Sequence, residues 1–269
     1  MTVARRFLAD RRRGFLWWSL GVLVTVGLTV AVWPSVRGQQ QFEDLVRDLP
    51  PAVRALFGAQ DGIPFTSPAG YLHGRLFSSL LPLLLVVFGI GLGARAVGGA
   101  EEDGTLELVL AHPVSRARVA FQRYAAVVVL ILGLTAVALA ALVAVAPAVG
   151  LLDDVAPARV AGAGAALTAL ALLHASLAFA TGCISGRRTI ASAVAGAVAV
   201  AGYLLVGLTA AAPDAVGALR WLSPWHWYLD RNLLVDAPPP TATLVPLALG
   251  LALAAAGGWR FLHRDLRLP

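Results

Sequence analysis

The stretch GAEEDGTLELVLAHPVSRARV, from Gly99 to Val119, separates two long apolar segments of the chain. It begins with the consecutive acids Glu101, Glu102 and Asp103, in a protein that is 58% hydrophobic and only 13% charged. Placing three acids at the centre of a bilayer costs about 8–10 kcal/mol on the scale of membrane insertion. The stretch must therefore lie in water, between two flanking segments that read as membrane spans.

The composition of the whole chain is that of an integral membrane protein. The 269 residues would suit one or two soluble domains, but the mean hydropathy is +0.77 and the charged residues are too few to cover a soluble surface. A helix needs ~20 mostly apolar residues to cross the hydrocarbon core. Six segments qualify, namely 14–33, 76–97, 124–147, 160–184, 190–212 and 243–259. We expect an all-α membrane protein with six transmembrane helices, forming a single transmembrane domain over residues 1–269.

Arginine positions predict the orientation of these spans. Two thirds of the 21 arginines fall in segments that are cytoplasmic if the N-terminus is inside, which predicts an N-in, C-in topology. The start, MTVARRFLADRRRGFLWW, resembles a signal peptide, but no small-x-small cleavage site follows it. We expect an N-terminal interfacial helix, with Phe7 and Leu8 in lipid, that continues into an uncleaved first span.

Several kinds of chemistry are not expected on this chain. Every basic residue is arginine, so the pattern G-x-x-x-x-G-K-[ST] of a P-loop cannot occur and ATP hydrolysis would need another protein. The GLGARA segment matches the G-x-G-x-x-A pattern of nucleotide-binding proteins, but it lies within a predicted span. Gly89 and Gly93 are better explained by close packing of helices. The single Cys183 reads as a small buried hydrophobe. We expect no cofactor, no metal and no nucleic-acid partner.

The polar insert contains the sequence of a short helix. TLELVLAH allows two turns with Leu106, Val109 and Leu110 on one face, Pro113 ends the helix, and Ser115 can cap the next one. A solvated turn between two spans is one interpretation. The other is a helix that docks in a groove of a partner. The loop SGRRT, after the fourth predicted span, shows that a turn needs few residues, which favours docking.

The insert resembles the first cytoplasmic loop of the ABC-2 type transporter permeases, with the pattern E-E-x-x-G-T-L-E-L-L-L-x-x-P-V-S-R. Residues that match are Glu101, Glu102, Gly104, Thr105, Leu106, Glu107, Leu108, Leu110, Pro113, Val114, Ser115 and Arg116, while Val109 departs. DLPPAVRALFG at 48–58, SPAGYL at 67–72 and WLSPWHWYLDRNLL at 221–234 resemble outer segments of that family, although DRN replaces the usual DPL. The resemblance implies a cytoplasmic coupling helix between the second and third spans.

The resemblance also implies a function. It indicates the transmembrane subunit of an ATP-driven exporter in the plasma membrane of a prokaryote, which works with two copies of an ABC ATPase and a second permease, identical or related. ATP and Mg²⁺ would bind the ATPase. The substrate would be hydrophobic or amphipathic, with drug or antibiotic efflux favoured. Reversing the charges of Glu101 and Glu102 would then uncouple transport without unfolding the chain. The alternative is a stand-alone secondary carrier or an assembly scaffold, although a carrier usually has more charge in its spans.

Two further groups of polar residues are candidates. His174 is the only ionisable residue near the middle of a predicted span, and with Ser176 it could line a substrate path. The alternative, which we favour, is a neutral histidine that bonds a neighbouring helix through Ser176 or Thr168. The second group could form an outer cap or a plain interfacial anchor, and it consists of Trp221, Pro224, Trp225, His226, Trp227 and Tyr228.

Overall fold

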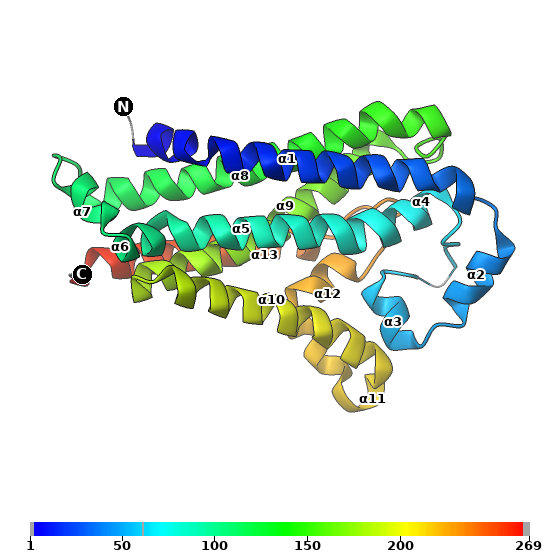
Figure 1. The fold of residues 1–269 in the computed structure, drawn as a ribbon. Coiled ribbons are helices and arrows are strands. Elements are labelled where there is room, and N and C mark those ends of the chain that lie inside the picture. Colours follow the sequence, from blue (N-terminus) through cyan, green and yellow to red (C-terminus); the bar gives the residue numbers. More distant parts are fainter. Residues whose placement is uncertain (1–2, 61, 266–269) are drawn as a thin grey trace.

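The computed structural model describes residues 3–60 and 62–265, and every regular element within these ranges is a helix (Figure 1). The elements are α1 (Val3–Val36), α2 (Gln40–Arg47), α3 (Pro51–Leu56), α4 (Pro68–Tyr71), η1 (Leu72–Leu80), α5 (Leu81–Ala94), η2 (Arg95–Gly99), α6 (Ala100–Glu102), α7 (Thr105–Leu110), α8 (Arg116–Val145), η3 (Ala146–Val149), α9 (Pro157–Ser185), α10 (Arg188–Ala211), α11 (Pro213–Val216), η4 (Gly217–Leu222), α12 (Pro224–Leu229) and α13 (Pro240–Leu262).

Six helical stretches of the described chain are long and apolar enough to cross a membrane. They are α1, the continuous run from α4 to α6, α8 with η3, α9, α10 and α13. Each of the six predicted spans lies within one of them, apart from a residue or so at their ends, which confirms a multi-pass membrane protein. Their orientation in the membrane stays a prediction.

Helix α9 lies at the centre of the bundle and is the most buried of the six spans. It packs against α13, α5, α10 and α8. Glycines of α5 allow a close approach to α9, because a Cβ at Gly93 would lie 2.1 Å from the carbonyl oxygen of Ala175, and one at Gly89 would lie 3.0 Å from that of Ala171. The predicted packing role of Gly89 and Gly93 is confirmed.

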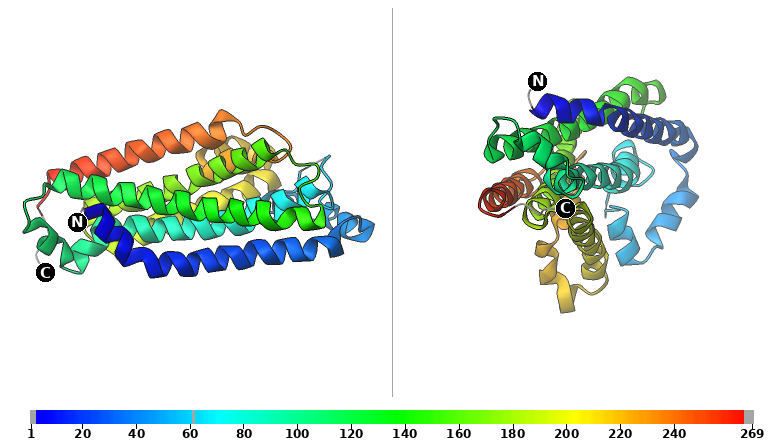
Figure 2. Two further views of the ribbon diagram at one scale, coloured as in Figure 1. Left: turned by 90° about the horizontal axis from the view of Figure 1, so that it is seen from above. Right: turned by 60° about the vertical axis from the view of Figure 1, so that its left-hand side comes forward.

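The two ends of the bundle differ in what they carry. Helix α1 begins, and helix α13 ends, on the same side of the bundle as α6 and α7 (Figures 1 and 2). Helices α2, α3, α4 and α11 lie at the opposite side. The insert between the second and third spans therefore lies beside both ends of the chain. We call this the inner end, following the predicted topology, and the opposite one the outer end.

The N-terminal segment differs from the sequence-based expectation. Its first turns lie at an angle to the rest of α1, yet the helix is continuous from Val3 to Val36 (Figure 2). Phe7 is buried in the apolar core, and the backbone N–H of Ala4 donates to Oε1 of Gln122 in α8 at 3.2 Å. Our expectation that Phe7 faces lipid is wrong, because packing against the bundle already removes the ring from water.

Candidate functional site

The polar insert forms a turn followed by a short helix at the inner end. The chain reverses at Gly104, whose φ of 68° is a left-handed conformation that glycine adopts without steric cost. The hydroxyl of Thr105, the first residue of α7, donates to the carbonyl oxygen of Ala100 at 3.1 Å. At the next helix, the hydroxyl oxygen of Ser115 accepts from the backbone N–H of Arg118 at 3.3 Å. The predicted short helix and the predicted cap at Ser115 are both confirmed.

The apolar face of α7 turns toward the bundle, which corrects an expectation from the sequence. Leu106 is only 1% exposed, and Val109 and Leu110 are half-buried against the core. Leu108 is 69% exposed, and Glu107 beside it is exposed as well. The chain itself covers the face that we assigned to a partner, because so short a helix is stabilised mainly by packing its apolar side. The surface that α7 offers to water is Leu108 with its charged neighbour.

Glu101 forms a buried ion pair with Arg264, which follows α13. The guanidinium binds both carboxylate oxygens in a bidentate arrangement. Nη1 of Arg264 donates to Oε1 at 2.8 Å, and Nη2 donates to Oε2. The two side chains are only 3% and 8% exposed. Nε of Arg264 donates to the carbonyl oxygen of Cys183 in α9 at 2.6 Å, and Nη1 of Arg116 donates to that of Arg264 at 2.9 Å. One carboxylate thus joins the insert to the ends of the fourth and sixth spans.

Glu102 reaches the fifth span. Its Oε2 accepts from the backbone N–H of Arg188 at 2.7 Å, at the first residue of α10, where a negative charge suits the positive end of the helix dipole. Gly186 precedes this helix with a φ of 65°, and a Cβ there would lie 2.7 Å from Oε1 of Glu101. The α9–α10 loop and the insert are therefore in direct contact.

The remaining residues of the predicted docking set are accessible in part. Glu102, Thr105, Pro113 and Ser115 are exposed, while Gly104 and Arg116 are half-buried. Arg264 was not in that set. The only sign of it in the sequence is its position just after the last span, at the same membrane boundary as the insert, and that position does not specify a partner.

His174 is buried in the middle of α9 and bonds its own helix. Its Nδ1 lies 2.9 Å from the carbonyl oxygen of Leu170, and Nε2 has no hydrogen-bond partner among the described residues. Ser176 instead bonds the hydroxyl of Tyr124 at 2.7 Å, and Thr168 bonds Thr135 of α8 at 3.0 Å. The expectation that His174 bonds through Ser176 or Thr168 is wrong, because both hydroxyls are engaged elsewhere.

The predicted outer cap folds as the short helix α12, apart from Trp221, which lies in the preceding η4. The hydroxyl of Ser223 donates to the carbonyl oxygen of Gly202 in α10 at 2.6 Å, and its oxygen accepts from the backbone N–H of His226. Tyr228 donates to the carbonyl oxygen of Phe77 in η1 at 2.6 Å. Pro224 is also buried, and α12 packs against α9, α10 and α13. These contacts tie α12 to the second and fifth spans.

The aromatic side chains of this region divide into two groups. Trp225 is buried, with its ring centroid 5.0 Å from that of Tyr203 and 6.2 Å from that of His174. Trp221 is exposed, and Trp227 is half-buried and donates its Nε1–H to the carbonyl oxygen of Trp221 at 3.0 Å. Two candidates that lie 51 residues apart in sequence, His174 and Trp225, are thus neighbours in space.

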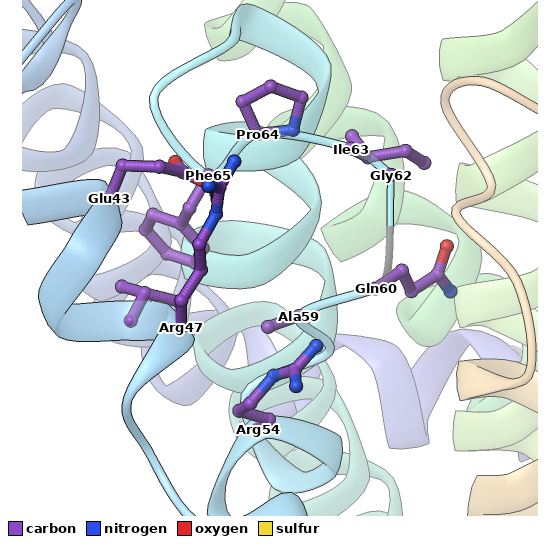
Figure 3. Close-up of a pocket in the computed structure, with 10 residues that line it drawn as sticks. Glu43, Arg47, Arg54, Ala59, Gln60, Gly62, Ile63, Pro64 and Phe65 are labelled. Atoms are coloured by element: carbon purple, nitrogen blue, oxygen red, sulfur yellow. Dashed lines mark ion pairs between the residues drawn. The ribbon is translucent and has the colours of Figure 1, made fainter. Parts of the chain in front are cut away.

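A separate cavity of about 360 Å³ lies at the outer end (Figure 3). Glu43 and Arg47 of α2 and Arg54 of α3 line it together with Gln60 and Phe65 of the following loop. Oε2 of Glu43 also accepts from the backbone N–H of Thr66, which fixes this loop against α2. No role for these residues was predicted from the sequence.

The fold and the site define a class of protein. Six apolar helices form a multi-pass membrane protein, and no group of three or more potential metal ligands occurs among the described residues. The family model for an ABC-2 family transporter protein matches residues 1–266. The chain belongs to the ABC-2 transporter family, whose members are membrane components of transport systems and usually work with an ATPase. A comparison with curated proteins finds no significant match.

Proposed function

We propose that this chain is the transmembrane subunit of an ATP-driven exporter, and that a separate ATPase docks on the α6–α7 insert. One observation carries the proposal. The insert combines an exposed residue, Leu108, with two carboxylates, Glu101 and Glu102. They accept bonds from Arg264 after the sixth span and from the backbone of Arg188 in the fifth, and Arg264 in turn bonds the end of the fourth. A partner that moves α7 would therefore act on the ends of three spans at once.

These contacts support a route by which such a movement would pass through the chain. The ion pair of Glu101 would carry it to Arg264 and hence to α13, while the bond from Arg264 to Cys183 would carry it to α9. The bond from the backbone of Arg188 to Glu102 would carry it to α10. Three spans would then rotate together, as rigid groups of helices do in transporters that rock between two states.

The proposed assembly contains four chains. Two permeases, identical or related, would enclose the path, and each would bind one ATPase. ATP and Mg²⁺ would bind the ATPases, since this chain has no lysine with which to build a P-loop. The role of this chain is conformational, because the acids of the insert hold helices together and are not placed to act as catalytic groups.

The proposed substrate is hydrophobic or amphipathic, and drug or antibiotic efflux is the use that we favour. The apolar side chains of the spans support this, together with the packing of α12 against α9, α10 and α13, where it would close the outer end of a path. Accumulation of a panel of amphipathic drugs should fall in cells that express the chain with its ATPase. Equal accumulation in cells that lack the chain would contradict efflux of those compounds.

Docking is tested by substituting Leu108 with serine. The tagged chain is purified from its native membranes in mild detergent, and a P-loop ATPase should copurify with it. Leu108→Ser should lower the copurified ATPase by about tenfold, the equivalent of one well-placed apolar anchor. Its melting temperature should stay near that of the wild type, because surface substitutions change stability by about 0.5 kcal/mol or less.

A matched control uses Leu45, which is 61% exposed in α2 at the outer end. Leu45→Ser makes the same chemical change far from α7 and should leave the amount of copurified ATPase unchanged. Wild-type binding by Leu108→Ser would contradict docking on α7. If no ATPase copurifies and the reconstituted chain transports under an ion gradient alone, the chain is a carrier and the proposal is wrong.

A further inference from the structure

Three arginines from different helices lie close together at the inner end. Arg11 belongs to α1, Arg95 to η2 and Arg123 to the start of α8, and α1 packs along α8 (Figure 1). Nη1 of Arg123 donates to the carbonyl oxygen of Ala96, next to Arg95, at 2.8 Å. The positive charge of Arg11 repels the charge of Arg95 and the charge of Arg123. We call these three residues the arginine cluster. They bring three positive charges close together at the inner ends of the first three spans.

The cluster contains hydrogen-bond donors that the chain does not use. Arg123 is only 7% exposed, and its Nε has no hydrogen-bond partner among the described residues. The buried Nε of Arg11 has none either. Burying a guanidinium without a counter-charge is unfavourable, and a buried donor without an acceptor adds to that cost. Such a site is stable when an anion with several acceptor oxygens occupies it.

The surrounding charges do not supply that anion. Arg6 and Arg188 lie near the cluster and add positive charge. The acids that act on it are Asp10 and Asp103, and both are exposed to water, where a carboxylate gains little by pairing. Cations outnumber acids in this region, so a negative ligand would be attracted.

The location of the cluster identifies the ligand. Arg11 precedes the first predicted span, Arg95 lies in the last turn of the second, and Arg123 precedes the third. The cluster is therefore at the depth of the lipid headgroups, and basic sites between transmembrane helices at that depth bind acidic headgroups. A guanidinium matches a phosphate with two parallel hydrogen bonds. Free phosphate would have no such reason to concentrate at this depth.

We propose that Arg11, Arg95 and Arg123 form a binding site for the phosphate of an anionic phospholipid, which joins the inner ends of the first three spans. Arg95 is exposed and Arg11 is half-buried, so both are open to a headgroup from the membrane side, with Arg123 behind them. The acyl chains would lie on the apolar outer face of α1, which exposes Leu16 and Trp17. The site does not depend on the proposed transport function.

The test measures the melting temperature of the purified chain with added phosphatidylglycerol or phosphatidylcholine. A ligand that binds only the folded state stabilises it by mass action, so phosphatidylglycerol should raise the melting temperature of the wild type by a few degrees, and phosphatidylcholine should not. Arg11→Gln with Arg123→Gln should abolish the shift and lower the amount of phosphatidylglycerol seen by native mass spectrometry by about tenfold or more.

The control pair is Arg12→Gln with Arg13→Gln. It removes the same charge from adjacent, exposed positions of α1 and should keep the full shift. If the variant of the buried Arg123 does not fold, Arg11→Gln with Arg95→Gln tests the same site from its exposed side. Equal loss of the shift in the control pair, or an equal shift with phosphatidylcholine, would overturn the proposal. An equal shift with inorganic phosphate would also overturn it, because the site would then bind free anions without selecting lipid.

Discussion

Glu101 and Arg264, 163 residues apart in sequence, form a two-bonded ion pair in which both side chains are almost completely buried. The pair lies at the inner end of the bundle, where the insert after the second span meets the residues after the sixth. The pair also gives part of the insert a structural role. One of its two leading glutamates supports the fold, and only the other, Glu102, is exposed.

The first prediction concerns this pair. Glu101→Gln should lower the free energy of unfolding by about 3–5 kcal/mol, because it leaves the buried guanidinium of Arg264 without its counter-charge. Combining it with Arg264→Gln should cost less than the sum of the two single changes, since neither charge then remains alone. Melting temperatures of the three variants in detergent measure this coupling.

Glu102→Gln is the control for that experiment, because it changes the neighbouring carboxylate, which is exposed. It should cost about 1 kcal/mol or less. Equal losses in Glu101→Gln and Glu102→Gln would contradict a structural role for the ion pair. The expectation that reversing the charge of Glu101 leaves the fold intact is not consistent with its burial.

The second prediction concerns Gly186. Gly186→Ala should destabilise the chain by more than about 1–2 kcal/mol, because its φ is left-handed and the new Cβ would meet Glu101. Gly196→Ala in α10 is the matched change, since nothing lies within 4 Å of a Cβ there. It should be neutral or stabilising by up to about 1 kcal/mol. Equal melting temperatures for the two variants would contradict the contact between the loop and the insert.

The third prediction tests the orientation in the membrane. A cysteine at Gln40, which is exposed at the start of α2, should react with an impermeant maleimide in intact cells. A cysteine at the exposed Thr105 should react only after the membrane is permeabilised. The native Cys183 is buried and should contribute little background. Labelling in the reverse order would overturn the N-in, C-in topology.

The fourth prediction concerns His174. His174→Ala should lower the melting temperature, at a cost of roughly 2–5 kcal/mol, because it empties a buried space beside Trp225. Transport per folded molecule should stay at the wild-type level, measured in vesicles after correction for the amount of folded protein. Unchanged stability with altered transport would instead place the imidazole on the substrate path.

The fifth prediction is a pH dependence at α12. Burial lowers the pKa of His226 below its usual 6.5, and the charge of Arg220 acts in the same direction, while Asp230, at 3.7 Å, opposes them. As the pH falls through that usual value, the unfolded state takes up the proton before the folded state does. Stability is therefore complete above the usual pKa and is lost as the pH falls toward the lower, folded-state pKa.

His226→Gln removes this dependence. The melting temperature of the wild type should drop more steeply than that of the variant between about pH 8 and about pH 5, the range in which histidine titrates. Parallel curves for the two proteins would mean that His226 does not contribute to stability through its protonation.

Much of the fold follows from local features of the chain. Long apolar runs gave all six spans, because a helix that crosses a bilayer needs a minimum length of apolar residues. Pro113 and Ser115 bounded the helices of the insert, because capping and helix termination depend on residues a few positions apart. The close approach of α5 to α9 was visible in the spacing of Gly89 and Gly93.

The candidate site could be located from the sequence but not assembled. The family pattern marked the insert, yet it did not show that Leu106 packs inward while Leu108 faces water. Nor did it identify Arg264 as the partner of Glu101, or show that the hydroxyls near His174 bond other groups. The cluster of Arg11, Arg95 and Arg123 was equally invisible, because its members come from three separate helices.

The sequence by itself determined that this chain is a multi-pass membrane protein with six candidate spans, a polar insert between the second and third of them, and no lysine from which a P-loop could be built. The tertiary structure decided which side of each helix is buried and which distant charges meet. The physical reason is that helices apolar on all sides carry no periodic signal of their rotation about their own axes. Their rotation, and with it the pairing of Glu101 with Arg264, is fixed only when small residues and buried polar groups of different spans come into contact.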